Sequence, residues 1–435
     1  MTYFIVNLGC VKNQVDAEIM DGALRQAGWE PSPEPQKAQV ILVNTCGFIR
    51  EAQRESIQTL QECLDVGPKV IGTGCLSQRW ARYLMSALPN LAGCFGNRRP
   101  EAIVEFLTER LPRGERIWLP DAEGADLDRA YRERPLQGLP FIAYVKISEG
   151  CDHHCTYCAI PQIRGRQRDR PKDAILREVD SFLSKGVKEI NLVAHDLASW
   201  GEGLVDLVRK LDAFPGEWWL RLLYIYPENF PEELIEVMAQ SHHLVPYLDI
   251  PFQHGSPAVL RRMGRKTDPQ QSLELIHRLR QQIPQLAVRT TFITGFRGET
   301  EEEFQELLAF HRQLAPEWAG IFAYSHEEGT SAWNNTKLGC LPPSKIVLQR
   351  KKRFEQQQQD LTLQALTQFI NQETAVLVEE KMEGTRTVLG RTCFQAPDVD
   401  GLTLVRWEHQ APEPGQFIKV RITGVRGVDL TAVTL

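Results

Sequence analysis

The chain has 435 residues, of which 42% are hydrophobic and 24% charged, and its formal net charge is −6. The length predicts about three domains, the composition is that of an ordinary soluble protein, and the charge gives no overall signature of nucleic-acid binding. No run of roughly 18 apolar residues suggests a membrane span, and no basic segment with an apolar core opens the chain as a signal peptide. Ten cysteines in a chain without these features favour metal binding over disulfides, so we expect a cytoplasmic protein.

Residues 1–130 are predicted to form an N-terminal α/β domain. We expect strands at 3–8, 39–44 and 69–73, with helices at 14–27, at about 49–64 and from about 77. This alternation indicates a parallel sheet flanked by helices.

A cysteine follows each of these three strands: Cys10, Cys46 and Cys75. Because the carboxyl ends of parallel strands meet at one edge, where such sheets bind ligands, the three thiols are expected to converge. Each has a glycine neighbour, which lets the backbone turn closely around a bulky object. Ordinary core cysteines would instead lie inside strands or on helix faces. We interpret the trio as ligands of an iron–sulfur cluster with one open iron.

Residues 112–140 are rich in proline, glycine and charge, which predicts a linker with an edge strand at 116–119. A second cysteine run follows a strand expected at 142–147. Cys151, Cys155 and Cys158 are spaced C-x₃-C-x₂-C, and three thiolates can bind three irons of a [4Fe–4S] cluster while leaving the fourth open. An open iron can bind and activate a small molecule. The alternative is a zinc site with His153 or His154 as fourth ligand.

Residues 135–370 are predicted to form the central domain. Further strands are expected at 189–194, 219–225, 247–252, 287–293 and 320–324, and helices at 172–184, 204–211, 232–240, 269–282, 301–314 and 344–370. The strand–helix alternation suits a partial (β/α)₆ barrel whose function lies at the carboxyl ends of its strands.

Four arginines at alternate positions, from Arg164 to Arg170, suit anion binding, although for any single one a solvated loop is the preferred interpretation. A strand, a glycine turn and a helix start occupy 291–300, where Thr300 and Glu303 can form a capping box. Residues 371–435 predict five short strands in a small antiparallel β-barrel. From residue 373 this module carries 7 Lys and Arg against 9 Asp and Glu. An RNA-binding barrel should be basic, so this one is better suited to a basic protein.

The Cys151–Cys158 run, with an aromatic residue before its last cysteine, closely resembles the signature of radical S-adenosylmethionine (SAM) enzymes. The whole chain resembles the methylthiotransferase branch of that superfamily, which has a cluster domain, a radical SAM barrel and a TRAM-like barrel. Within the branch it is similar to the ribosomal-protein (RimO) type. The matching runs are LGCVKN at 8–13, VNTCGFI at 43–49, KISEGC at 146–151, AIPQIRGR at 159–166, YLDIP at 247–251 and EEGT at 327–330. Departures occur at Val11, Arg297 and 194–201.

This resemblance implies two [4Fe–4S] clusters and SAM, with Cys151, Cys155 and Cys158 on the cluster that cleaves SAM. The other trio would hold the cluster that supplies sulfur, and the acceptor would be the β-carbon of an aspartate in small-subunit ribosomal protein twelve, bound through the C-terminal barrel. An electron donor such as flavodoxin or ferredoxin is also implied. We place the SAM contacts at four residues: Tyr157, Asp196, Gly295 and Glu299. The alternatives are the same chemistry on a tRNA adenosine, a non-enzymatic iron–sulfur electron carrier, and a zinc-stabilised binding module.

Overall fold

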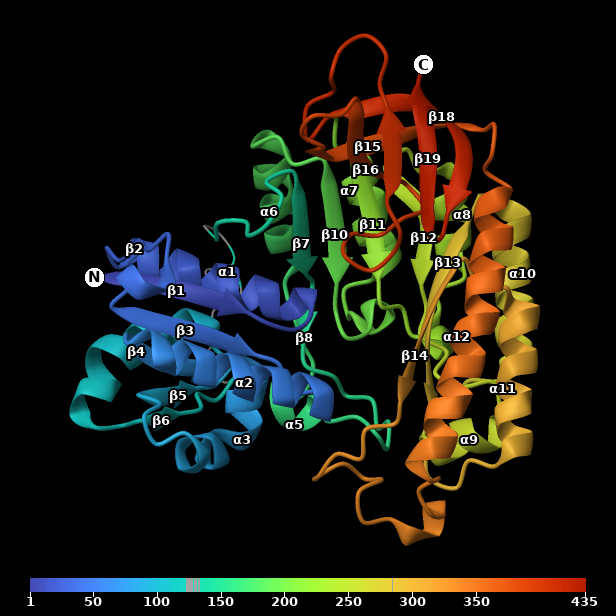
Figure 1. Cartoon of the computed structure of the whole chain (residues 1–435). Coiled ribbons are helices and arrows are strands. Elements are labelled where there is room, and N and C mark those ends of the chain that lie inside the picture. Colours follow the sequence, from blue (N-terminus) through green and yellow to red (C-terminus); the bar gives the residue numbers. More distant parts are fainter. Residues whose placement is uncertain (123–127, 129–130, 132–133, 284) are drawn as a thin grey trace. The chain divides into compact units, whose positions relative to one another are not determined.

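The computed structural model describes residues 1–122, 128, 131, 134–283 and 285–435 (Figure 1). Parts of the predicted linker, at 123–127, 129–130 and 132–133, lie outside the described residues. The chain divides into two compact units. The first unit comprises Met1–Gly138, Tyr144–Glu178 and Ser325–Trp333, and the second comprises Leu139–Ala143, Val179–Tyr324 and Asn334–Leu435.

A parallel sheet with the strand order β2-β1-β3-β4-β5-β6 forms most of the first unit. Its strands are β1 (Thr2–Asn7), β2 (Glu30–Pro31), β3 (Val40–Thr45), β4 (Lys69–Thr73), β5 (Gly93–Phe95) and β6 (Ile117–Trp118). The helices that connect them are α1 (Val11–Gln26), α2 (Arg50–Val66), α3 (Gly74–Ala87) and α4 (Ile103–Glu105). The predicted α/β sheet is confirmed, with β2 and β5 as short additions.

Every residue of β3 is buried, as expected for a central strand of a parallel sheet covered on both faces. Ile41 and Val43 pack with Val70 in one core. Leu42, between them, packs with Ile71 in a second core on the opposite face. The two cores hold the carboxyl ends of the strands, and the loops that follow them, at one edge of the sheet.

The first unit also contains a small hairpin in which β8 (Ser148–Glu149) pairs antiparallel with β9 (Arg168–Asp169). The short helix α5 (Ile160–Arg164) lies between these strands in the sequence. The second cysteine run therefore lies in a loop whose two ends are joined by the hairpin.

The central sheet has six strands in the order β14-β13-β12-β11-β10-β7, which is the chain order reversed and agrees with the predicted partial barrel. The strands are β7 (Ile142–Lys146), β10 (Glu189–Val193), β11 (Trp219–Leu223), β12 (Leu244–Asp249), β13 (Ala287–Thr294) and β14 (Trp318–Ala323). The helices are α6 (Lys172–Ser184), α7 (Leu204–Asp212), α8 (Glu233–Gln240), α9 (Pro257–Arg262), α10 (Pro269–Gln282), α11 (Glu301–Leu314) and α12 (Ser344–Thr367). The capping box predicted at Thr300 and Glu303 is present at the start of α11.

The C-terminal strands close into a barrel in the order β15-β16-β17-β19-β18 (red in Figure 1). They are β15 (Glu373–Lys381), β16 (Thr387–Thr392), β17 (Thr403–Arg406), β18 (Phe417–Arg426) and β19 (Asp429–Thr434). Neighbouring strands run antiparallel except β17 and β19, which are parallel.

This barrel contacts the amino-terminal ends of the central strands. Glu189, the first residue of β10, forms an ion pair with Arg391 of β16 at 2.5 Å. The Trp318 indole, at the start of β14, donates a hydrogen bond to the Phe394 carbonyl at 2.9 Å. The barrel is therefore attached at the edge of the sheet opposite to the carboxyl ends of its strands.

None of the helices in the described part of the chain is both long enough and apolar enough to cross a bilayer.

Candidate functional site

The three N-terminal cysteines lie at the carboxyl ends of β1, β3 and β4, which are neighbours in the first sheet. Cys10 directly precedes α1, Cys46 directly follows β3, and Cys75 is the second residue of α3. Cys10 is exposed, Cys46 half-buried and Cys75 buried. The structure therefore brings the three residues to one edge, while their role as cluster ligands remains a prediction.

Close packing between the loops explains two of the neighbouring glycines. A Cβ atom on Gly9 would lie 2.9 Å from the Cβ and 3.1 Å from the Sγ of Cys46. A Cβ atom on Gly47 would lie 2.6 Å from the Cα of Leu76 and 2.9 Å from the carbonyl carbon of Cys75. The absence of a Cβ at these glycines lets the cysteine loops touch one another. The structure therefore explains the glycines by contact between loops, whereas the sequence suggested that they leave space for a bulky ligand.

Asn13, fully buried in α1, ties these loops together. Its side-chain amide donates hydrogen bonds to the carbonyls of Leu8 at 2.9 Å and Thr45 at 3.0 Å. The backbone carbonyl of Asn13 accepts a hydrogen bond from the Asn44 side chain at 2.7 Å. The side-chain oxygen of Asn13, Oδ1, lies 3.2 Å from the Sγ of Cys75. The loops after β1 and β3 and the third thiol are thus held on one side chain.

The three thiols influence each other's charge. Burial and, next, the charge of Cys75 raise the pKa of Cys46 to about 12. Burial raises the pKa of Cys75. The positive charge of Arg164 opposes this increase, and the negative charge of Cys10 adds to it. Although Cys10 is exposed at its surface, desolvation by the surrounding residues disfavours a charge on it, but Lys12 and Arg164 outweigh this effect and lower the pKa of the thiol. As thiolates these three residues would repel one another, and ligation to a positively charged iron–sulfur core, which binds thiolates, would remove that cost.

The second triplet lies in the loop closed by the β8–β9 hairpin. The Cys151 amide donates to the Gly165 carbonyl at 3.2 Å, and the Cys158 amide donates to the Cys155 carbonyl at 3.1 Å. Gly150 has a φ of +80°, and a Cβ there would lie 2.7 Å from the Gly165 carbonyl oxygen. All three cysteines are half-buried. The loop is thus wound tightly, with its cysteine residues partly exposed.

Both triplets belong to the first unit. Buried Cys75 packs against Ala159, which directly follows Cys158, and against Ile163 of α5. The two loops therefore share a small core.

Among the described residues, no three His, Cys, Asp or Glu side chains lie close enough together to hold one metal ion. A four-iron cluster places its ligands differently, because each thiolate binds a separate iron atom. The donor chemistry of both triplets fits such a cluster.

A segment that the sequence reasoning left without a role, Ser325–Trp333, packs in the same unit. Glu327 forms an ion pair with Arg79 of α3 at 2.7 Å, both side chains being about 5% exposed or less. The Ala332 amide donates to the carbonyl of Thr156, inside the second cysteine loop, at 2.8 Å. The only signal for this segment in the sequence was the EEGT run at 327–330.

The preferred interpretation of the arginine run, a solvated loop, is right for one member and wrong for two. The Arg166 side chain is 91% exposed. The Arg164 and Arg170 side chains are only 2% and 1% exposed, and both form ion pairs. Alternating charge along a loop does not reveal which side chains the fold encloses.

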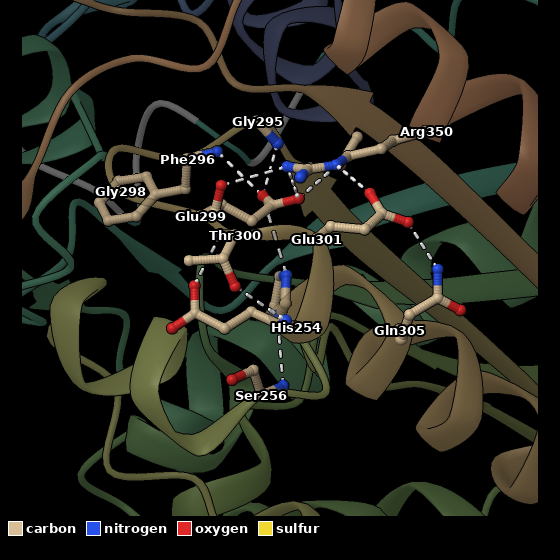
Figure 2. Close-up of polar contacts among 12 residues, drawn as sticks. His254, Ser256, Gly295, Phe296, Gly298, Glu299, Thr300, Glu301, Gln305 and Arg350 are labelled. Atoms are coloured by element: carbon tan, nitrogen blue, oxygen red, sulfur yellow. Dashed lines mark hydrogen bonds and ion pairs between the residues drawn. The ribbon is translucent and has the colours of Figure 1, made fainter.

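Glu299 supports the glycine turn after β13 (Figure 2). One carboxylate oxygen accepts hydrogen bonds from the amides of Gly295 at 2.6 Å and Phe296 at 3.1 Å. The other accepts from the Thr294 hydroxyl at 2.8 Å and the Arg350 guanidinium at 3.0 Å. Burial raises the pKa of Glu299, against these donors. The Glu299 carboxylate thus accepts hydrogen bonds from the turn to which it belongs. Its contact with SAM remains a prediction.

Two other predicted SAM contacts, Gly295 and Asp196, are also packed internally. A Cβ on Gly295 would lie 2.6 Å from a methyl of Val347 in α12. The buried Asp196 carboxylate accepts a hydrogen bond from the Tyr226 amide at 3.1 Å. Tyr157 lies half-buried in the cysteine loop of the first unit, whereas Gly295 and Asp196 belong to the second.

Comparison with known proteins accounts for this organisation. The radical SAM superfamily matches residues 145–311, uncharacterized protein family UPF0004 matches 2–96, and the TRAM domain matches 370–435. A ribosomal protein uS12 methylthiotransferase RimO from Desulforudis audaxviator is 40% identical, over 99% of this chain and 96% of that protein. The RimO of Carboxydothermus hydrogenoformans is 36% identical, over 99% and 98%.

The chain belongs to the RimO family of radical SAM methylthiotransferases. It is therefore a transferase, and the family and fold class predicted from the sequence are confirmed.

Solved structures show the fold at lower similarity. The radical SAM methyltransferase TsrM from Kitasatospora setae superposes with a TM-score of 0.55, at 15% identity and 76% coverage of each chain. The cobalamin-dependent SAM radical enzyme OxsB gives a TM-score of 0.52, at 14% identity, over 82% of this chain and 56% of that one.

Proposed function

We propose that this RimO-family enzyme adds a methylthio group to the β-carbon of an aspartate in ribosomal protein uS12. The proposed cofactors are two [4Fe–4S] clusters and SAM. The observation that carries the proposal is the presence of two three-thiol sets, at a sheet edge and in a hairpin-closed loop, within one compact unit. A protein that only carries electrons would need a fourth ligand for each cluster, which neither set supplies nearby in the sequence.

Each cysteine triplet is proposed to hold a cluster with a different role. Cys151, Cys155 and Cys158 are proposed to hold the cluster that binds SAM, and Cys10, Cys46 and Cys75 the cluster that carries the sulfur to be transferred. When bound, these cofactors supply the electron, the hydrogen abstraction and the methylated sulfur. The polypeptide fixes the thiols.

Residues around the thiols hold the cysteine loops in place. Asn13 holds the loops after β1 and β3, and Arg164 donates to the sulfur of Cys75. The segment Ser325–Trp333 holds the second cysteine loop through Thr156. Ligands fixed by hydrogen bonds to neighbouring residues keep their geometry when a cofactor binds, which is the usual role of groups one layer behind a metal site.

The C-terminal barrel is proposed to bind the acceptor protein. With 7 Lys and Arg against 9 Asp and Glu from residue 373 on, it favours a basic protein over tRNA. Because the barrel is attached at the amino ends of the central strands, it would grip a part of the acceptor other than the reacting aspartate. A flavodoxin or ferredoxin is the proposed electron donor. An acceptor from the ribosome places the reaction in the cytoplasm.

The proposed enzyme has three domains, at residues 1–130, 135–370 and 371–435. The matched family regions at 2–96, 145–311 and 370–435 support this division.

The test is a direct competition between acceptors. Anaerobically reconstituted enzyme, SAM and a reductant are incubated with purified uS12 and, separately, with bulk tRNA, and both are analysed by mass spectrometry. We expect uS12 to gain one methylthio group on an aspartate and tRNA to remain unchanged. Modification of tRNA alone would establish the adenosine-modifying alternative, and enzyme that cannot cleave SAM would favour the electron carrier.

A further inference from the structure

A buried network of four charged side chains lies beside the cysteines of the first unit. Arg164 contacts the carboxylates of Asp16 at 2.7 Å and Glu149 at 3.1 Å. Lys146 contacts the same two carboxylates, each at 2.5 Å. The four side chains are between 1% and 8% exposed. Two positive and two negative charges balance, so the network can be buried without a net charge.

Arg164 also reaches beyond this network to a predicted cluster ligand. Its second amino group, Nη2, donates to the Sγ of Cys75 at 3.5 Å and to the Oδ1 of Asn13 at 2.6 Å. Asn97 donates to the same sulfur from its side-chain amide at 3.3 Å. Cys75 therefore receives two hydrogen bonds, of which one comes from a charged donor.

The same arginine is linked to the second triplet. Its partner Glu149 stands two residues before Cys151, and its neighbour Gly165 accepts the hydrogen bond of the Cys151 amide at 3.2 Å. A guanidinium has a planar fork of five donors and can serve several acceptors at once, which a lysine ammonium cannot do with the same geometry.

We propose that Arg164 is a positioning residue that joins the two thiol triplets and raises the reduction potential of the cluster held by Cys10, Cys46 and Cys75. The inference rests on the proposed function. Hydrogen bonds and positive charge at a ligating sulfur favour the reduced, more electron-rich cluster, so they raise its potential. The competing interpretation is that Arg164 only stabilises the fold through its ion pairs.

The test measures a potential rather than a turnover. In a chain that carries Cys151→Ala, Cys155→Ala and Cys158→Ala, only the first cluster should assemble, and its midpoint potential is measured by a titration followed by electron paramagnetic resonance. We expect Arg164→Lys to lower the potential by about 59 mV, a tenfold shift of the one-electron reduction equilibrium. The double variant Asp16→Asn/Arg164→Gln keeps the network neutral and should lower the potential by at least as much.

A buried arginine of the second unit provides the matched control. Arg391 is 1% exposed and contacts Glu189 at 2.5 Å and Glu379 at 2.6 Å. Arg391→Lys should reduce the stability of the protein and leave the potential unchanged. An unchanged potential in both Arg164 variants overturns this inference, as does an equal shift in Arg391→Lys. A background protein that assembles no cluster at all would instead contradict the proposed function.

Discussion

The cysteine edge of the first unit and the glycine turn after β13 of the second were both predicted from the sequence to bind cofactors, but they are built differently. At the cysteine edge, three thiols are held together by Asn13 and by close-packed glycines, and burial and then the charge of Cys75 raise the pKa of Cys46. At the glycine turn, each polar atom of Glu299 is satisfied by the turn itself or by Arg350 (Figure 2).

The difference predicts a binding site at the cysteine edge and a structural role for the glycine turn. Thiolates brought together in this way would repel one another and gain stability from a positively charged partner. Among the described residues, Lys12 and Arg164 act in this direction on Cys10, whose pKa they lower against its desolvation. A carboxylate that accepts four internal hydrogen bonds gains little from a ligand, because it would first have to lose one of them. We therefore expect the two regions to respond in opposite ways to substitution.

Replacing Cys75 should have the largest effect. In Cys75→Ala, methylthiolated uS12 should fall below detection while 5′-deoxyadenosine still forms from SAM, because cleavage of SAM is assigned to the other triplet. Mass spectrometry of the acceptor and chromatography of the nucleoside measure the two outcomes. Cys94→Ala, which changes a buried core cysteine of β5, should retain both. Loss of SAM cleavage in Cys75→Ala would contradict the division of roles.

A methyl group at Gly47 tests whether the loops must touch. Because a Cβ there would lie within 3 Å of the backbone of Cys75 and Leu76, Gly47→Ala should displace the loop and reduce the iron bound by the first triplet. Gly320→Ala is the matched control, since its Cβ would meet its nearest atom at 3.8 Å. Iron is counted after anaerobic reconstitution. Full iron content in Gly47→Ala would show that the close approach is not required.

Glu299 should behave as a scaffold residue. Glu299→Ala leaves the buried Arg350 guanidinium without its main partner, so the free energy of unfolding should fall by about 3–5 kcal/mol. Glu301→Gln removes a carboxylate that is 49% exposed and should cost less than about 1 kcal/mol. Urea unfolding of the iron-free protein measures both. A Glu299→Ala protein of unchanged stability that fails to bind SAM would make Glu299 a ligand after all.

His254, next to Glu299, gives the turn a dependence on pH. Burial, and then the charges of Arg262 and Arg350, lower its pKa to about 3. The folded protein binds fewer protons there than the unfolded chain, so its stability is complete above pH 6.5 and declines as the pH falls toward 3. We expect a loss of about 2 kcal/mol between pH 6.5 and pH 5.

The variant His254→Asn isolates this contribution. Urea unfolding at the two pH values should give a smaller difference for His254→Asn than for the unchanged protein. An identical difference would assign the pH dependence to other groups, such as His311, whose pKa burial lowers to about 4.

The sequence revealed the parts whose signals are local. Cysteines directly after strands were found because residue type and position together imply the chemistry, and the capping box at Thr300 and Glu303 is a four-residue pattern. A strand of three residues is too short to show a recognisable pattern of apolar residues, so β5 was not predicted.

The supporting contacts could not be found in this way, because they join residues far apart in the chain. Arg79 and Glu327 are 248 positions apart, and Asn13 and Arg164 are 151 apart. The sequence also could not show that the Glu299 carboxylate accepts hydrogen bonds from its own turn, and the SAM contact predicted there stays a prediction. Only the fold shows which acceptors are occupied.

Counting iron and sulfide in three proteins tests the central claim most directly. The unchanged chain, the Cys10/Cys46/Cys75→Ala variant and the Cys151/Cys155/Cys158→Ala variant are reconstituted anaerobically under identical conditions. Two independent clusters predict about eight irons per unchanged chain and about four in each variant. Equal iron in the unchanged chain and the Cys10/Cys46/Cys75→Ala variant would contradict the account, because the first sheet edge would then hold no cluster.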